Sequence, residues 1–141
     1  MKVYVLDANV ALRFLLADDP KQSPAARSLF AAAEAGTLRL SLNQVTLAEL
    51  TWVLASFYEF PAADVGSKLR GLLLHSGIEC EEQDIALDTL DRLARTNLDF
   101  ADCYAAAWGC HHQQSVASYD RDFRKFADVK VMTPEEILKQ P

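Results

Sequence analysis

Residues 1–20 read MKVYVLDANVALRFLLADDP, and an acidic residue interrupts the apolar pattern at Asp7. The run from Val3 to Leu6 is short and rich in β-branched residues, as in a buried strand, and a second apolar run begins at Val10. A carboxylate between two core-bound segments costs several kcal/mol unless it finds a cation or hydrogen-bond donors. Asp7 is therefore expected either to cap the following helix or to belong to a functional site.

The rest of the chain alternates short apolar strands with helical segments. Strands are expected at residues 2–6, 37–41, 78–80, 115–118 and 129–132. Helices are expected at residues 8–17, 24–36, 44–58, 82–95 and 99–112, with a further helix ending at 77 and a last one starting at the capping box 133–136. This alternation predicts an α/β fold in which one short parallel sheet is flanked by helices on both faces. No linker or internal repeat divides the chain, so a single domain over residues 1–141 is expected.

The composition is that of a globular protein with an excess of acidic residues. Half of the 141 residues are hydrophobic, and 20 acidic against 14 basic residues give a net charge of −6. A nucleic-acid-binding surface is normally basic, but an acidic chain suits a protein that gathers carboxylates around a divalent metal. No apolar run approaches the roughly 20 residues that span a bilayer, and no secretory signal precedes the first strand. A cytoplasmic protein without membrane contact is expected.

Several conspicuous side chains are expected to be structural. The three cysteines form no C-x-x-C motif and no even set, so neither a disulfide framework nor a zinc site is predicted. The expected structural residues are Trp52, Trp108, Cys103 and Cys110 in the core, His75, His111 and His112 at helix ends, and Arg92 as a surface charge.

Two acidic residues follow predicted strands directly. Asp7 follows the first strand and Asp120 follows the strand 115–118, and in open α/β sheets ligands bind beyond the carboxyl ends of strands. For either residue taken alone, a role as the N-cap of the next helix is the better explanation. An acidic residue after each of two strands that are expected near the centre of the sheet favours a functional site. Asp122, two residues further on, is either a ligand or a solvated turn residue.

Glu49 lies on a predicted helix face with Val45, Trp52 and Val53, and its helix offers no Lys or Arg as a partner. A glutamate buried on such a face must be neutral, paired from another segment or bound to a metal.

Asp99 and Asp102 are separated by three residues at the start of a largely apolar helix. Asp99 is placed as the N-cap, and Asp102 lies in the first turn, where the helix dipole keeps a carboxylate ionised. Since one cap suffices, Asp102 is interpreted as the functional residue and Asp99 as its support.

Carboxylates gathered at one sheet edge repel one another unless a cation holds them. Oxygen ligands without histidine or thiolate select Mg²⁺ or Mn²⁺, which supports phosphoryl-transfer chemistry. A phosphotransferase with an aspartyl nucleophile would need a second acid where this chain has Asn9, and the glycines form no nucleotide-binding motif. A non-catalytic binding module, in which the acids only cap helices, remains an alternative.

Four segments in order resemble the PIN-domain ribonucleases, and specifically the VapC-type toxins of bacterial toxin–antitoxin pairs. The opening segment VLDANVALRFLLADDP resembles the family's Asp-x-Asn motif, and LAELTWVL its glutamate helix. The segments LDFADCYAAA and SYDRDF resemble its third and fourth acidic motifs. The resemblance covers the full length and implies a PIN-like three-layer sandwich.

The resemblance also implies an activity and a set of site residues. The activity is Mg²⁺- or Mn²⁺-dependent hydrolysis of RNA phosphodiesters, giving 5′-phosphate and 3′-hydroxyl ends, by a homodimer that a separate antitoxin inhibits. The implied metal-binding and catalytic residues are Asp7, Glu49, Asp102 and Asp120, with Asn9, Asp99, Ser118 and Asp122 in support. Arg13, Arg121 and Arg124 are the residues expected to contact RNA phosphates.

Overall fold

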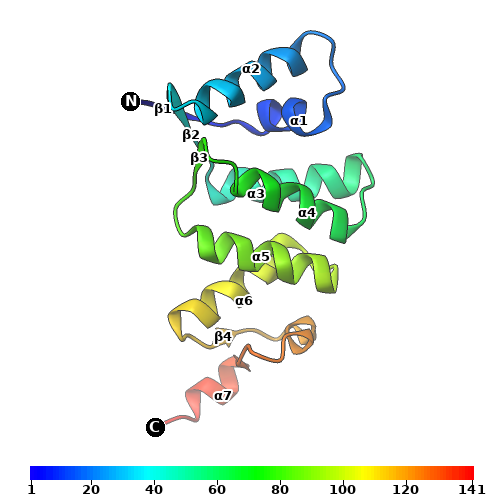
Figure 1. The fold of residues 1–141 in the computed structure, drawn as a ribbon. Helices are drawn as coiled ribbons and strands as arrows, with labels where there is room; N and C mark the ends of the chain where they lie inside the picture. The colour runs from blue at the N-terminus through cyan, green and yellow to red at the C-terminus, as the bar shows by residue number, and fades with distance from the viewer.

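A computed structural model describes residues 1–141 and shows an elongated molecule, in which pairs of helices are stacked along the long axis (Figure 1). The N-terminal half consists of β1 (Lys2–Val5), α1 (Ala8–Leu16), α2 (Gln22–Glu34), β2 (Leu38–Ser41), α3 (Gln44–Trp52), the π-helical turn η1 (Val53–Phe57) and α4 (Ala62–Leu73). The C-terminal half consists of β3 (Ile78–Glu79), α5 (Gln83–Thr96), α6 (Phe100–His112), β4 (Val116–Ala117), the 3₁₀ turn η2 (Arg121–Lys125), β5 (Val131–Met132) and α7 (Pro134–Leu138).

The strands form two separate parallel ladders. The first has the order β1-β2-β3, with Val3 opposite Arg39 and Leu40 opposite Ile78. The second pairs β4 with β5, with Val116 opposite Val131. The α/β class and the parallel pairing are confirmed, but the strands do not form the single sheet that the sequence led us to expect. Both β1 and β4 consequently have a strand neighbour on one side only.

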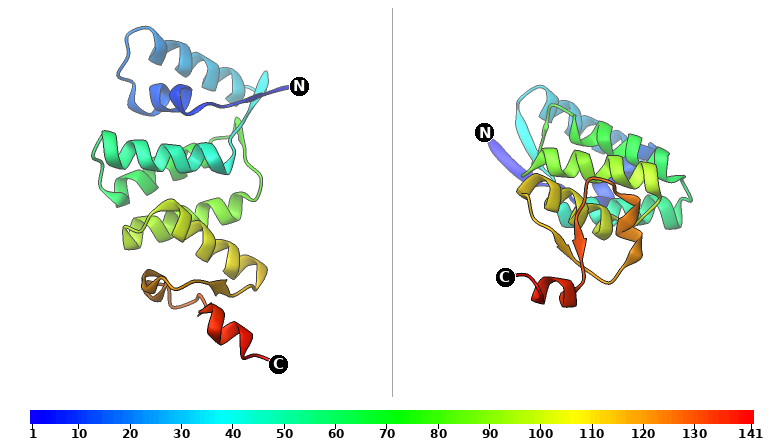
Figure 2. Two further views of the ribbon diagram at one scale, coloured as in Figure 1. Left: turned by 180° about the vertical axis from the view of Figure 1, so that it is seen from behind. Right: turned by 90° about the horizontal axis from the view of Figure 1, so that it is seen from below.

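The expectation that β1 is fully buried is wrong. Val5 is 75% exposed, and Val3 and Tyr4 are also exposed. The strand is at the edge of its ladder, and the ladder lies at one end of the helix layers (Figures 1 and 2). Its apolar side chains therefore find no covering layer.

Local capping signals explain where the helices begin. The Asn43 side chain accepts a hydrogen bond from the Thr46 N–H at 2.9 Å at the start of α3. At α7, Thr133 and Glu136 form a reciprocal capping box behind Pro134. Each cap satisfies backbone donors that the first helical turn leaves unpaired, and these predicted helix starts are confirmed.

The hydrophobic core lies between the helices. Viewed along the long axis, the helix pairs overlap in a narrow stack (Figure 2). The largest fully buried side chains are Phe30, Leu6, Leu40, Leu42, Leu47, Leu50, Leu54, Leu69, Leu72, Leu73, Leu90 and Val65. No helix has the length and apolar character needed to cross a membrane.

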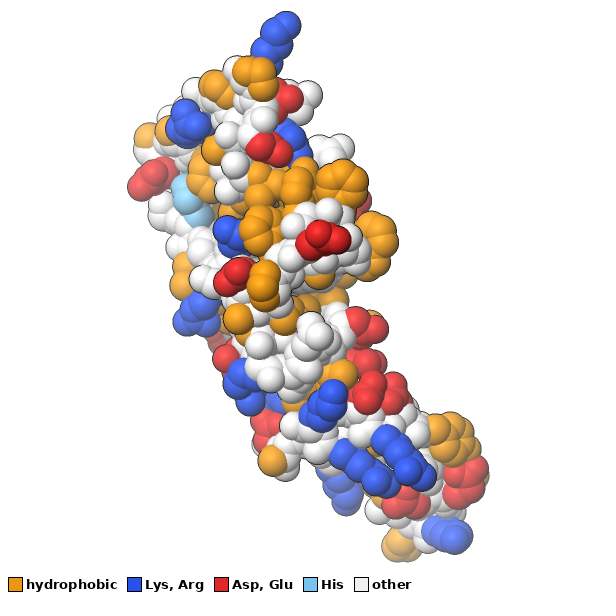
Figure 3. Space-filling model, turned by 90° about the vertical axis from the view of Figure 1, so that its right-hand side faces the viewer, with side chains coloured by type: hydrophobic (Ala, Val, Ile, Leu, Met, Phe, Trp, Pro, Cys, Tyr) orange, Lys and Arg blue, Asp and Glu red, His pale blue; other side chains and the backbone are white.

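The core placement predicted for the two tryptophans is wrong. Trp52 is 66% exposed, and Trp108 is also exposed. The outer face of α3 is open, because Val45 and Phe57 beside it are exposed as well. Figure 3 shows hydrophobic side chains gathered in the upper part of one face of the molecule, above a region crowded with charged residues. Cys103, by contrast, is buried as predicted.

Candidate metal centre

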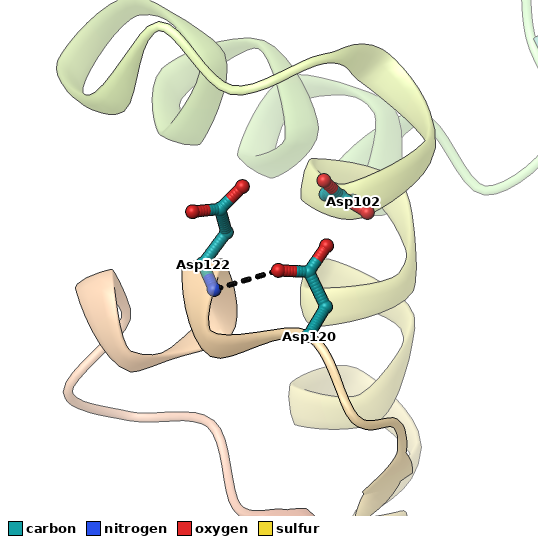
Figure 4. Close-up of side chains that lie close together, drawn as sticks. All are labelled: Asp102, Asp120 and Asp122. Atoms are coloured by element: carbon teal, nitrogen blue, oxygen red, sulfur yellow. Dashed lines mark hydrogen bonds between the residues drawn. The ribbon is translucent and has the colours of Figure 1, made fainter.

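Three carboxylates converge where the start of α6 meets the segment after β4. Asp102 comes from the first turn of α6, while Asp120 and Asp122 come from the segment that enters η2. One carboxylate oxygen from each lies within 4.8 Å of the others. Figure 4 shows the three side chains facing the same space.

Hydrogen bonds to the backbone hold the loops that carry these acids. The Asp99 carboxylate accepts from the Asp102 N–H at 3.0 Å, so Asp99 is the N-cap of α6 as predicted. The Ser118 hydroxyl accepts from the Asp120 N–H at 2.9 Å, and the Asp120 carboxylate accepts from the Asp122 N–H at 2.8 Å (Figure 4). Asp99 and Ser118 thus fix the backbone that carries Asp102 and Asp120, and the supporting roles predicted for them in a metal site stay a prediction.

The surroundings of Asp102 disfavour its negative charge. Burial raises the pKa of Asp102 above its ordinary value, and the neighbouring carboxylates of Asp99, Asp120 and Asp122 raise it further. No Lys, Arg or His forms an ion pair with Asp102, Asp120 or Asp122. The cluster therefore concentrates negative charge that the protein itself leaves uncompensated.

The donor set fits a hard divalent cation. Three carboxylates supply only oxygen ligands, which suit Mg²⁺ or Mn²⁺ better than zinc. Asp120 and Asp122 are exposed and Asp102 is half-buried, so that the site is open to solvent and to a large substrate. Asp102, Asp120 and Asp122 thus form an acidic cluster that could hold a divalent metal ion.

Asp7 and Glu49 do not lie in this cluster. Asp7 is exposed and accepts from the Asn9 N–H at 3.2 Å as the N-cap of α1, so the expected desolvation is wrong and the capping role is confirmed. Glu49 is exposed on the open face of α3, so its expected burial is also wrong. Both expectations failed for the same physical reason: β1 and α3 present their apolar faces to solvent. The assignment of Asp7 and Glu49 as metal ligands stays a prediction.

Of the three arginines expected to contact RNA, Arg13 makes structural contacts, whereas Arg121 and Arg124 are exposed. Arg13 pairs with Asp18 at 2.8 Å and donates to the Tyr58 hydroxyl at 3.0 Å, which leaves it little freedom to hold phosphate. Arg121 and Arg124 lie exposed on η2, next in sequence to the acidic cluster. Their assignment as contacts to RNA phosphates stays a prediction, as does that of Arg13.

The expectation that Arg92 is a surface charge is wrong, since Arg92 is only 2% exposed. Its guanidinium donates to both Asp128 oxygens, at 2.8 and 2.6 Å, and to Asp88 at 3.0 Å, and it lies over the Phe126 ring. The segment after η2 is thereby anchored to α5. Helical spacing could have predicted the burial of Arg92, because Ile85 and Thr89 lie on the same buried face of α5.

Comparison with known proteins identifies the family. Residues 4–129 match the PIN domain, so the chain belongs to the PIN-domain family. Among solved structures, a chain in the crystal structure of VapBC2 from Rickettsia felis bound to a DNA fragment from their promoter matches this chain. The TM-score is 0.36 and the identity 14%, over 93% of this chain and 98% of that one. No curated protein matches the chain.

Proposed function

We propose that the chain, as a single PIN-like domain over residues 1–141, is a Mg²⁺- or Mn²⁺-dependent endoribonuclease. We further propose that it acts in the cytoplasm as the toxin of a toxin–antitoxin pair, bound by a separate antitoxin protein. Support comes from membership of the PIN family, whose members are typically nucleases, and from the four acidic segments that resemble those of VapC-type toxins.

The observation that carries the nuclease proposal is the convergence of Asp102, Asp120 and Asp122 within 4.8 Å. These residues come from two segments with different local structure, and no basic side chain neutralises them. Such a cluster is costly without a cation, because burial and the neighbouring carboxylates raise the pKa of Asp102. A divalent ion offsets that cost.

In the proposed enzyme, Asp102 and Asp120 hold the ion, with Asp122 beside them. When bound, a divalent ion activates water and stabilises charge on a phosphoryl group. Asp7 and Glu49 are proposed as further ligands, with Asn9 and Ser118 orienting the acidic segments. Arg121 and Arg124 are proposed to contact the phosphates that flank the cleaved bond.

A non-catalytic binding module is the second candidate. The observation in its favour is that Asp7, Asp99 and Asp120 each accept a backbone hydrogen bond as a helix cap. Capping does not account for Asp102, because Asp99 is the N-cap of α6 and the Asp102 carboxylate lies in a cluster of like charge. The two candidates therefore differ in what they predict for that residue.

RNA cleavage tests the choice. We expect RNA cleavage by the wild type in Mn²⁺ or Mg²⁺, none in EDTA, and a loss of at least about 100-fold in Asp102→Asn, since removing one ligand disables both water activation and charge stabilisation. Asp84→Asn is the matched control, because Asp84 is an exposed acid in the first turn of α5, away from the cluster. Equal cleavage by Asp102→Asn and wild type would favour the binding module.

A further inference from the structure

The segment that carries Asp120 and Asp122 is not part of the first strand ladder. Its strand β4 pairs only with β5, so no hydrogen bond between strands ties it to β1, β2 or β3. Asp102, by contrast, belongs to α6, which packs against α5. The distance from Asp102 to the other two acids therefore depends on how the chain after β4 is fastened to α5 and α6 (Figure 4).

Arg92 of α5 fastens that part of the chain. Its Nη1 and Nη2 atoms donate to the two carboxylate oxygens of Asp128, at 2.8 and 2.6 Å, while its Nε donates to Asp88 at 3.0 Å. The guanidinium carbon lies 5.1 Å from the centre of the Phe126 ring. A bidentate pair of this kind fixes the orientation of the partner as well as its distance. Asp128 and Phe126 are thereby held against α5.

Cys110 ties the same point to α6. Its thiol donates to the Asp128 carbonyl oxygen at 3.2 Å, and its Sγ accepts from Nη2 of Arg92 at 3.4 Å. Towards η2, the Phe126 N–H donates to the Phe123 carbonyl oxygen at 3.1 Å, and both rings are buried. A displacement of Asp128 would therefore move η2 with it.

The acidic cluster needs such a fastening because its members repel one another. Asp102, Asp120 and Asp122 have carboxylate oxygens within 4.8 Å of each other. Arg92 does not neutralise them, since its ion pairs are with other carboxylates. A loosely held segment would relieve the repulsion by moving away from α6.

We propose that Arg92 is a positioning residue of the acidic cluster: its clamp on Asp128 fixes η2 against α6 and so sets the distance from Asp120 and Asp122 to Asp102. A buried ion pair commonly gives no more stability than apolar side chains of the same volume, so what Arg92 adds is the direction of its bonds. Metal ligands have to be held within about 0.5 Å of their working positions. The inference rests on the proposed metal-dependent function.

Mn²⁺ titration calorimetry on the whole chain tests this role through the sign of the change. Arg92→Met removes a positive charge and keeps a long apolar side chain. If Arg92 acted on the cluster only through its charge, this variant would bind Mn²⁺ more tightly. A positioning residue predicts the opposite, a loss of at least about 10-fold in affinity. Arg92→Lys keeps the charge but lacks the planar fork, so its affinity should lie between those of the wild type and Arg92→Met.

Two control variants separate positioning from a general loss of charge or of stability. Arg95→Met removes a positive charge from the same helix, where the pair with Asp91 is exposed, and should bind Mn²⁺ as the wild type does. Gly77→Ala disturbs the turn between α4 and β3, outside the clamp, and should also leave the affinity unchanged. Asp128→Asn added to Arg92→Met should weaken binding no further, because both changes remove the same clamp.

A folded Arg92→Met protein that binds Mn²⁺ as tightly as the wild type, or more tightly, would overturn the positioning role and leave the metal centre intact. A loss of affinity in Gly77→Ala as large as that in Arg92→Met would overturn it equally. Should circular dichroism show that Arg92→Met does not fold, Arg92→Lys and Asp128→Asn decide: weaker binding by both is expected, and wild-type affinity in both would overturn the role. No saturable binding by folded wild-type protein would remove the metal centre and the positioning role together.

Discussion

Asp102 is held in surroundings that disfavour its charge, and this is the most informative single residue in the chain. Its pKa is raised by burial and by three neighbouring carboxylates, and no basic group offsets the repulsion. A carboxylate raised in this way binds protons more tightly in the folded state, so its ionisation at neutral pH lowers the stability of the metal-free protein. A carboxylate whose pKa is raised by burial and by neighbouring carboxylates is typical of a functional site.

The residue-scale predictions succeeded where the signal was local. The spacing of Asp99 and Asp102 gave the cap correctly, because an N-cap depends only on the next few residues. Glu49 and Arg92 were misplaced, since burial depends on which distant segment covers a helix face. The face of Glu49 is open, and that of Arg92 is closed by Phe126 and Asp128.

Arg92 and Asp128 give a prediction for acid stability. The hydrogen bonds from the Arg92 guanidinium lower the pKa of Asp128 from 3.8 to about 2. Because the folded pKa is depressed, the pair stabilises the folded state fully above about pH 4, and this contribution is lost as the pH falls towards 2. Because the Asp128 side chain is 62% exposed and solvent screens the pair, Asp128→Asn should cost no more than about 1 kcal/mol near pH 6, with most of the difference gone by pH 2.

Urea unfolding of wild type and Asp128→Asn across this pH range measures the effect. Asp91→Asn is the matched control, because the pair between Asp91 and Arg95 is exposed on both sides and should contribute little at any pH. A stability difference between wild type and Asp128→Asn that stays constant from pH 6 to pH 2 would contradict the assignment.

At the scale of elements, the turn between α4 and β3 is fitted closely against α2. A Cβ atom at Gly77 would lie 2.8 Å from the carbonyl carbon of Ala33 in α2, whereas one at Gly71, inside α4, would meet nothing within 4 Å. The Gly77 carbonyl also accepts from the Leu40 N–H, so this turn fixes β2 beside β3. The turn at Gly77 therefore has no room for a side chain, whereas the helix at Gly71 has room for one.

Gly77→Ala should destabilise the protein by about 2–3 kcal/mol, because backbone has to move to admit the methyl group. Gly71→Ala should stabilise it by roughly 0.5–1 kcal/mol, because alanine is the better helix former. Thermal or urea unfolding of both variants measures the contrast. A Gly77→Ala variant as stable as Gly71→Ala would mean that α2 does not pack against this turn.

The positions of the elements followed from the sequence, but their arrangement did not. Caps at Asn43, Asp99 and Thr133 set helix starts within a few residues, so nearly every predicted helix and strand is present. Strand pairing across the chain has no such local signal. The separation of β4 and β5 from β1 therefore could not be foreseen, nor could the exposure of Trp52 that goes with it.

For the whole molecule, the elongated stack separates the residues that the sequence motifs suggested would act together. Asp102, Asp120 and Asp122 lie in the C-terminal half, while Asp7 and Glu49 lie in the N-terminal half. Whether Asp7 and Glu49 take part in metal binding with the cluster therefore stays a prediction.

The most direct test of the account is Mn²⁺ titration calorimetry on wild type, Asp102→Asn and Asp84→Asn. We expect saturable binding to the wild type and to Asp84→Asn, and a loss of at least about 10-fold in affinity for Asp102→Asn. The metal-free Asp102→Asn protein should unfold at a temperature at least as high as that of the wild type, which shows that it is folded. No saturable Mn²⁺ binding by folded wild-type protein would contradict the metal centre and, with it, the proposed nuclease.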